Sequence, residues 1–181
     1  MATASTTLAV VLFIVVIASI SVVQNAADAT HSYEQMEQSA DYIIYKNEGS
    51  TLAKNGITGN IDFSSINATY VIQSAVNAGG NVYLKEGTYV LDWNINITRS
   101  STIMSGAGAG TVLYLEDGYS VASKNPWQPA TIRVGNSQGG ASNVVLRDFT
   151  INGNAAGQIG GAAAIGVYKS YNCLIENVYI H

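Results

Sequence analysis

The chain of 181 residues carries charged side chains at only 11% of its positions, where about 25% is usual for globular domains. Its formal net charge of −4 and the lack of any cluster of Lys and Arg in the sequence exclude the electrostatic surface that a nucleic acid needs. A single cysteine, Cys173, excludes a disulfide framework within one chain, and its place among alternating apolar residues predicts an inert packing role. With 18 Gly and only 2 Pro, the composition favours an all-β domain rich in tight turns.

The N-terminal segment has the features of an export signal. The apolar run from Leu8 to Val23 would reach about 24 Å as a helix, which is short of the roughly 30 Å hydrocarbon core of a bilayer. The small residues Ala27-x-Ala29 fit a signal-peptidase site. We therefore predict a signal peptide over residues 1–29 and a protein that is secreted or held at the cell surface. An uncleaved membrane anchor is the alternative, because the segment contains no Lys or Arg, and it is the only membrane contact that we expect.

Residues 30–40 show neither the helical nor the strand period and are predicted to be a linker. After them, Tyr42–Tyr45 is predicted to be a first strand and Ile61–Phe63 a second short one. A helix follows over residues 67–78, with Asn67 as its N-cap. Its apolar positions recur every three or four residues and form one stripe: Ala68, Val71, Ile72, Ala75 and Val76. Residues 41–80 therefore form an N-terminal cap whose helix covers the open end of the strands that follow.

A nine-residue pattern occurs twice near the C-terminus, at Asn143–Ile151 and again at Asn172–Ile180, 29 residues later. In each copy, apolar residues alternate with polar ones, as expected for a strand with one buried face. The alternation slips by one residue at Asp148 and at Asn177. Asp and Asn tolerate the left-handed backbone conformation, so each copy is predicted to be two short strands joined by a sharp bend.

Earlier segments repeat this strand–bend–strand unit. Strands are expected at Asn81–Leu84, Thr88–Leu91, Ile95–Thr98, Ser101–Met104, Thr111–Leu115, Thr131–Val134 and 162–167. The bends align as a column of Gly106, Asp148 and Asn177, with Glu86 or Gly87 in the first row. The inward residues align as two further columns, one of Val82, Thr102, Val144 and Cys173 and one of Leu84, Met104, Leu146 and Ile175.

A unit of this kind cannot bury its apolar face alone and must stack on its neighbours. We therefore predict an all-β fold, a right-handed parallel β-helix (solenoid) over residues 81–181 with an N-terminal capping α-helix. The sequence ends at His181, directly after the last predicted strand and without a capping helix or a polar final coil. An open apolar edge is unusual in a finished solenoid, so we expect the coils to be incomplete and truncated at the C-terminal end.

The run of residues 116–130 interrupts the coils and is predicted to be an inserted loop. It contains the best sequence candidates for stacking on a sugar ring, Tyr119 and Trp127. The alternative for Trp127 is that its ring seals the loop onto the coils. Glu116 and Asp117 stand at the mouth of the loop, where solvated turn residues are the main interpretation and calcium ligands the alternative.

Three charged residues, Arg147, Asp148 and Glu176, are expected to lie near one another if the coils stack. A surface ion pair between coils, with Asp148 in its bend, explains them, and a catalytic role is the alternative. Asn67 and Asn96 each begin a glycosylation sequon that is used only in a host that glycosylates exported proteins. A glycan on Asn67 would compete with its role as N-cap.

Four segments together resemble the N-terminal part of the pectate-lyase superfamily: Ala68–Val76, Gly79–Tyr89, Thr102–Thr111 and Asn143–Gly153. This broad set of secreted β-helix proteins includes pectate lyases, polygalacturonases, rhamnogalacturonases and viral tailspikes. The resemblance covers residues 40–181 and implies a role in polysaccharide binding or degradation. Members often carry an aspartate pair before the capping helix, where this chain has Ser64-Ser65-Ile66-Asn67.

The chemistry of the superfamily is not visible in this sequence. Its hydrolases resemble one another in paired aspartates and a Gly-His-Gly, and neither pattern occurs here. Its lyases would need an acidic cluster for calcium and an Arg or Lys as base, so we expect no metal site and no cofactor unless further coils supply calcium ligands.

Two function classes therefore stay open, and whether the chain is an enzyme is undecided. The first is an extracellular polysaccharide lyase or glycoside hydrolase whose catalytic coils are missing from this chain. The second is a non-catalytic surface adhesin or tailspike-like carbohydrate-binding module. In both, the expected partner is a polysaccharide or a cell-surface glycan.

Overall fold

The computed structural model describes residues 32–119, 130–158, 160, 161 and 163–181, in two compact units divided after Gln38. The described part of the first unit is helical over residues 32–38. The linker predicted for residues 30–40 is therefore partly helical, because Glu34, Met36 and their neighbours are good helix formers. The predicted signal peptide lies outside the described residues. Among those that are described, no helix has the length and apolar character needed to cross a membrane.

The second unit, Ser39–His181, is mostly β-structure. Its described residues include one α-helix, α2 (Ala68–Ala78), and a short 3-10 helix, η1 (Ala155–Gly157). Its strands are β1 (Tyr42–Asn47), β2 (Ser50–Asn55), β3 (Ile61–Ser65), β4 (Asn81–Leu84), β5 (Gly87–Leu91), β6 (Ile95–Ile97), β7 (Ile103–Gly106), β8 (Thr111–Leu115), β9 (Ala130–Val134), β10 (Val145–Asn152), β11 (Ala163–Val167) and β12 (Leu174–Ile180).

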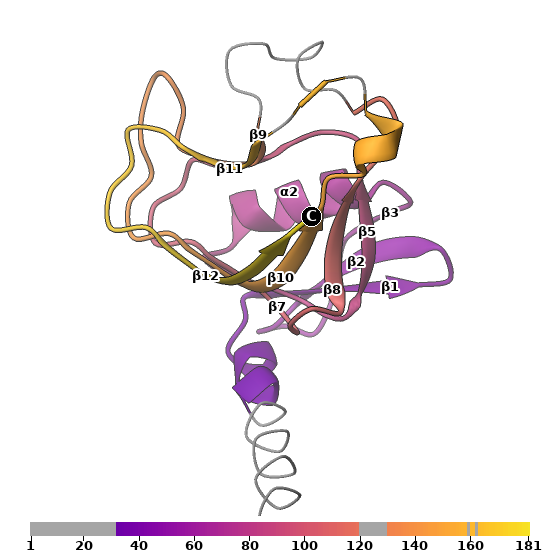
Figure 1. The fold of residues 1–181 in the computed structure, drawn as a ribbon. Coiled ribbons are helices and arrows are strands. Elements are labelled where there is room, and N and C mark those ends of the chain that lie inside the picture. Colours follow the sequence, from indigo (N-terminus) through magenta and orange to yellow (C-terminus); the bar gives the residue numbers. More distant parts are fainter. Residues whose placement is uncertain (1–31, 120–129, 159, 162) are drawn as a thin grey trace, which may run out of the picture. The chain divides into compact units, whose positions relative to one another are not determined.

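From β4 onward every pairing is parallel, and the strands form three columns (Figure 1). The first column contains β4, β7 and the first halves of β10 and β12. The second contains β5, β8 and the second halves of β10 and β12. The third contains β6, β9 and β11. Strand β10 joins two columns because it bends at Asp148, pairing with β7 before the bend and with β8 after it. The expectation of an all-β body with parallel strands is confirmed.

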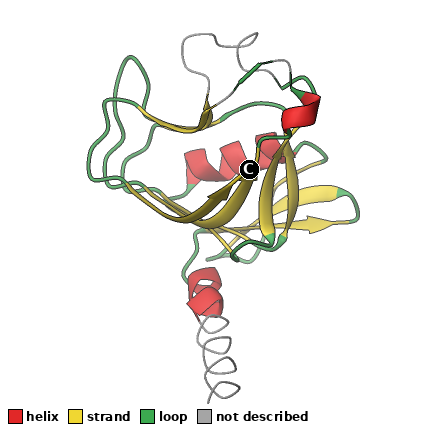
Figure 2. Ribbon diagram, in the orientation of Figure 1, coloured by secondary structure: helices red, strands yellow, loops and turns green. Residues whose placement is uncertain are grey.

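The strands before the helix are arranged differently. β1, β2 and β3 pair antiparallel, and β1 then joins the parallel sheet through β4 (Figure 2). The predicted strands at Tyr42–Tyr45 and Ile61–Phe63 are present as β1 and β3. β2 has no counterpart in the sequence analysis, because its inward residues are the small Thr51 and Ala53, which give no apolar alternation.

Helix α2 is the element predicted for residues 67–78. The Oδ1 atom of Asn67 accepts a hydrogen bond from the backbone N–H of Tyr70 at 3.0 Å, which makes Asn67 the N-cap. All five residues of the predicted stripe are at most 2% exposed and belong to the core. The side chain of Gln73 accepts from the N–H of Asn96 at 2.7 Å and donates to its C=O at 2.9 Å. A side-chain amide therefore takes the place of a further strand at the edge of β6.

The register confirms part of the predicted alignment and corrects the rest. Met104, Leu146 and Ile175 lie side by side in the first column, as expected. The first row is wrong by two residues, because Met104 pairs with Val82 and not with Leu84. The connection from β4 to β5 has two residues and that from β7 to β8 has four, so an alignment by bends alone misplaces β4. A shift of two keeps every side chain on its face of the sheet, so the inward residues were still identified.

Candidate functional site

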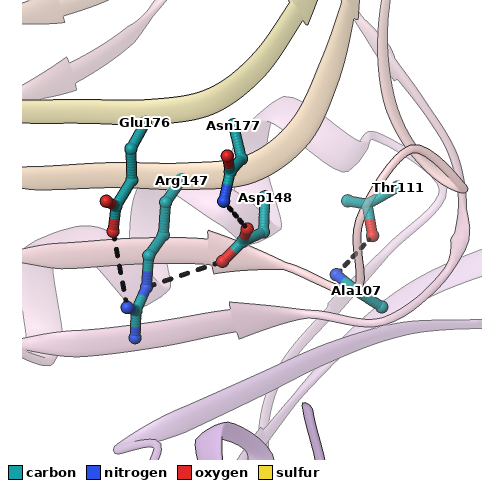
Figure 3. A network of polar contacts seen from close by, with 6 residues as sticks. All are labelled: Ala107, Thr111, Arg147, Asp148, Glu176 and Asn177. Carbon is teal, nitrogen blue, oxygen red and sulfur yellow. Dashed lines mark hydrogen bonds and ion pairs between the residues drawn. The ribbon is translucent and has the colours of Figure 1, made fainter. Parts of the chain in front are cut away.

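The bend column is a corner between the first and second strand columns. Asp148 and Asn177 have φ values of 60° and 51°, in the left-handed region. Nδ2 of Asn177 donates to Oδ1 of Asp148 at 3.0 Å and so links successive corners (Figure 3). At Gly106 a Cβ atom would overlap with the carbonyl oxygen of Asp148, which explains the glycine. Glu86 and Gly87 lie outside this column, because the register places Leu84 beside Gly106.

The predicted charged group forms at this corner. Nε of Arg147 lies 3.7 Å from Oδ2 of Asp148, and its Nη1 lies 3.6 Å from Oε1 of Glu176 (Figure 3). Only 12% of the Asp148 side chain is exposed, and its other oxygen accepts from Asn177. Both carboxylates therefore face the same guanidinium and hold adjacent coils together. An ion pair this exposed contributes about 0–1 kcal/mol, and the arrangement supports a structural role.

A second polar region lies where the second strand column turns into the third. Three turns, residues 92–94, 116–118 and 153–158, connect these columns, and we call them the turn ridge. The second and third turns contact each other through the N–H of Gly118, which donates to the C=O of Gly157 at 2.8 Å. The Glu116 N–H donates at 3.1 Å to the C=O of Leu91, the residue of β5 that precedes the first turn.

The acidic pair predicted at the loop mouth lies on this ridge. Oδ1 of Asp117 accepts from Nδ2 of Asn154 at 2.7 Å, and the Glu116 carbonyl accepts from Nε2 of Gln158 at 2.8 Å. These contacts match the turn interpretation, in which the pair ties one turn to the next. In the described parts of the chain, no three His, Cys, Asp or Glu side chains lie close enough to hold a metal ion.

Trp93 is the aromatic residue that the ridge presents to solvent, with 42% of its surface exposed. Its neighbours are anchored on both sides. The Asp92 N–H donates to Oγ1 of Thr69 at 3.1 Å, and its carboxylate accepts from Asn67 at 2.9 Å. Asn94 is 6% exposed and donates to Asn96 at 2.7 Å. The sequence analysis missed Trp93, because a single aromatic residue in a short turn has no periodic signature.

The two aromatic candidates from the sequence have different outcomes. Tyr119 is 2% exposed and belongs to the hydrophobic core, so its ring is not available to stack on a sugar, and that prediction is wrong. Burial, with a smaller contribution from the carboxylate of Asp92, raises the pKa of the Tyr119 hydroxyl. The hydroxyl has no hydrogen-bond partner in the described structure. Trp127 lies outside the described residues.

The two sequon asparagines are both used inside the fold. Asn67 caps α2 and donates to Asp92, so its amide has two structural roles. Oδ1 of the half-buried Asn96 accepts from Asn94. Cys173 is half-buried, and its Sγ lies 3.8 Å from the carbonyl oxygen of Ala141, in keeping with a packing role.

A hollow of about 340 Å³ lies at the end of the columns beyond β12. Its walls are mostly apolar, with Leu115, Ile151, Ala164 and Ile180 among the lining residues. The polar side chains of Thr131, Gln158 and His181 also reach it. The hollow is the open end of the core between the columns.

Comparison with known proteins adds no functional assignment, because neither a family model nor a curated protein matches this chain. In the described residues, the turn ridge combines an exposed aromatic ring on an anchored turn with amide and carboxylate groups.

Proposed function

We propose that residues 81–181 form coils of a right-handed parallel β-helix and that the exported chain binds a polysaccharide along its turn ridge. The three columns of parallel strands, the left-handed Asx corners and the capping helix support the β-helix, as does the resemblance to the pectate-lyase superfamily. The observation that carries the binding proposal is the exposed indole of Trp93 on its anchored turn.

An indole suits a saccharide because its flat apolar face packs against the C–H face of a sugar ring. The turn that carries Trp93 is held at Asp92 and Asn94, so little conformational freedom is lost on binding. The other two turns of the ridge supply a carboxylate, from Asp117, and an amide, from Asn154, as partners for sugar hydroxyl groups.

The charge of the ridge favours a neutral polysaccharide. Asp92, Glu116 and Asp117 place three carboxylates along it, and the net charge of the chain is −4. A polyuronate would meet like charge there, which lowers both its association rate and its affinity. The proposed ligand is therefore a neutral polysaccharide and not an acidic one.

We further propose binding without cleavage by this chain, as in the adhesin or tailspike-like class. The nearest approach to a catalytic group, Arg147 with Asp148 and Glu176, is engaged between coils. A glycosidase needs one carboxyl group on each side of the scissile bond, and a lyase needs an unengaged base. Release of reducing ends or of unsaturated products from any polysaccharide would contradict this part of the proposal.

The experiment compares binding of the purified full-length chain to neutral glucan and galactan with binding to polygalacturonate, by affinity gel electrophoresis. Trp93→Ala is expected to weaken binding to the neutral ligand about fivefold to tenfold, the loss typical of one aromatic contact. Tyr171→Ala is the matched control, because Tyr171 is 68% exposed and lies outside the ridge. Equal losses in both variants, or binding of polygalacturonate alone, would refute the ridge as the site.

A further inference from the structure

Strand β12 has one unpaired edge. Among the described residues it pairs only with β10, and its other edge faces away from the sheet (Figure 1). Four of its apolar residues are 45–59% exposed: Leu174, Ile175, Tyr179 and Ile180. The β10 residues that pair with Ile175 and Ile180, Leu146 and Ile151, are each 1% exposed. The inward residues of β10 are buried, whereas the corresponding residues of β12 are exposed. The β12 edge is therefore an apolar surface that no described strand covers.

The hydrogen bonds to β10 show which backbone groups of β12 face the free edge. The N–H of Leu174 donates to Val144 at 2.9 Å and that of His181 donates to Ile151 at 3.1 Å. Successive residues of a strand direct their N–H and C=O groups to opposite sides, and the corner at Asn177 resets this alternation. The groups that face the free edge thus belong to Cys173 and Ile175 before the corner, and to Val178 and Ile180 after it.

These four residues are arranged symmetrically about the peptide bond between Glu176 and Asn177. Cys173 and Ile180 are equally distant from it in sequence, and so are Ile175 and Val178. A two-fold axis through the corner therefore sets Cys173 opposite Ile180 of a second copy, and Ile175 opposite its Val178. Each such pair is antiparallel and exchanges two backbone hydrogen bonds, so the edge is complementary to itself.

The side chains fit the same arrangement. The four residues face the interior, since Ile175, Val178 and Ile180 pair with the buried Leu146, Phe149 and Ile151. In the two-fold pairing, apolar interior residues meet apolar interior residues. Glu176 lies opposite Asn177 of the second copy, so the pairing does not set two carboxylates against each other.

We propose that the chain forms a homodimer through the β12 edge, by antiparallel pairing of β12 with β12 of a second copy. The pairing gives hydrogen-bond partners to the backbone N–H and C=O groups at the free edge of β12. It also closes the hollow of about 340 Å³ that Ile151 and Ile180 line. The two corners coincide on the axis, so both arms of the bent strand pair at once. This inference does not require polysaccharide binding. The residues of β12 that form the pairing lie outside the turn ridge, while Gly153, Ala155 and Gln158 of the ridge line the hollow that the pairing closes.

The first test is the oligomeric state of the full-length chain, measured by sedimentation equilibrium. The unaltered chain is expected to be a dimer and Ile175→Lys a monomer, because a lysine there would place a charge inside the pairing. Ile66→Lys is the matched control, since Ile66 is 84% exposed outside β12, and it is expected to stay dimeric. A monomeric unaltered chain overturns the proposal.

The second test reads the register and does not depend on how well a lysine is tolerated. Ile180→Cys places a thiol opposite the native Cys173 of the second copy, at about 5.5 Å between Cα atoms, which a disulfide can span. Mild oxidation is expected to give a disulfide-linked dimer, and a reductant is expected to cleave that disulfide. Tyr179→Cys, whose side chain points to the opposite face, is expected to give none. No cross-link from Ile180→Cys, or equal cross-linking from both, refutes this register.

Discussion

At the scale of single residues, one corner is built in two physically different ways. Asp148 and Asn177 occupy it because their backbones are left-handed, and their side chains hydrogen-bond to each other. Gly106 has no such backbone conformation and is required by space, since the carbonyl oxygen of Asp148 fills the position of a Cβ. The sequence analysis grouped all three as bend residues and so found the column, although not the reason for each member.

Tyr119 and Tyr89 are a matched pair of buried hydroxyls with different surroundings. Tyr89 donates to the carbonyl of Lys85 at 2.9 Å, whereas the Tyr119 hydroxyl has no partner in the described structure. A buried polar group without a partner costs about 1–3 kcal/mol, and a satisfied one contributes about 1 kcal/mol. Tyr119→Phe is therefore expected to leave the free energy of unfolding unchanged or raise it, and Tyr89→Phe to lower it by about 1 kcal/mol. Urea denaturation measures both changes, and a Tyr119→Phe protein that is clearly less stable would show that the hydroxyl is satisfied.

At the scale of elements, the helix cap depends on one side chain. Asn67 satisfies the Tyr70 N–H and also bonds to Asp92, which connects α2 to the turn ridge. Asn67→Ala is expected to reduce the free energy of unfolding by about 1 kcal/mol, the usual effect of losing an N-cap. Asn67→Asp keeps the capping oxygen but loses the donor to Asp92, so its loss should be smaller if the cap is the main contribution. Thermal unfolding followed by circular dichroism compares them, and equal stability of Asn67→Ala and the unaltered chain would argue against the cap.

The sequence predicted the elements that have a clear period and missed those without one. Helix α2 and the repeated strands β10 and β12 were found because their inward positions are large and apolar. β2 was missed because Thr51 and Ala53 face the interior, and small residues do not mark a face. The register of β4 was misplaced because turn length varies from coil to coil, which apolar alternation does not report.

The candidate site shares only part of its residues with those singled out in the sequence. Glu116 and Asp117, expected in a turn, lie on the turn ridge and contact its third turn. Tyr119 was expected to be exposed there and is buried, since aromatic residues fill cores as well as surfaces. Trp93 was not singled out, because its exposure depends on how residues 92–94 are anchored to α2 and β6.

At the scale of the whole molecule, buried tyrosines make stability sensitive to alkaline pH. Burial raises the pKa of Tyr89, with a smaller effect of Tyr83, and burial likewise raises that of Tyr119. The unfolded chain loses these protons near pH 10, while the folded chain retains them. Stability is therefore complete below about pH 10 and falls as pH rises further, because the unfolded state then binds fewer protons.

Chemical denaturation at a series of pH values on both sides of the ordinary tyrosine pKa of roughly 10 tests this. The free energy of unfolding is expected to stay level at first and to decline at the alkaline end. A double variant, Tyr89→Phe with Tyr119→Phe, should decline less steeply than the unaltered chain. Parallel curves for the two proteins would assign the alkaline loss to other groups.

The amide of Gln73 has a consequence for how a molecule of this type can vary in length. It occupies both backbone groups of Asn96, so the strand column that begins with β6 cannot accept another member on that side. Duplication or loss of a 29-residue repeat such as the one from Asn143 to Asn172 must then be accommodated away from α2. The number of coils can therefore change only at the end of the stack remote from α2, so the two ends of the stack are not equivalent.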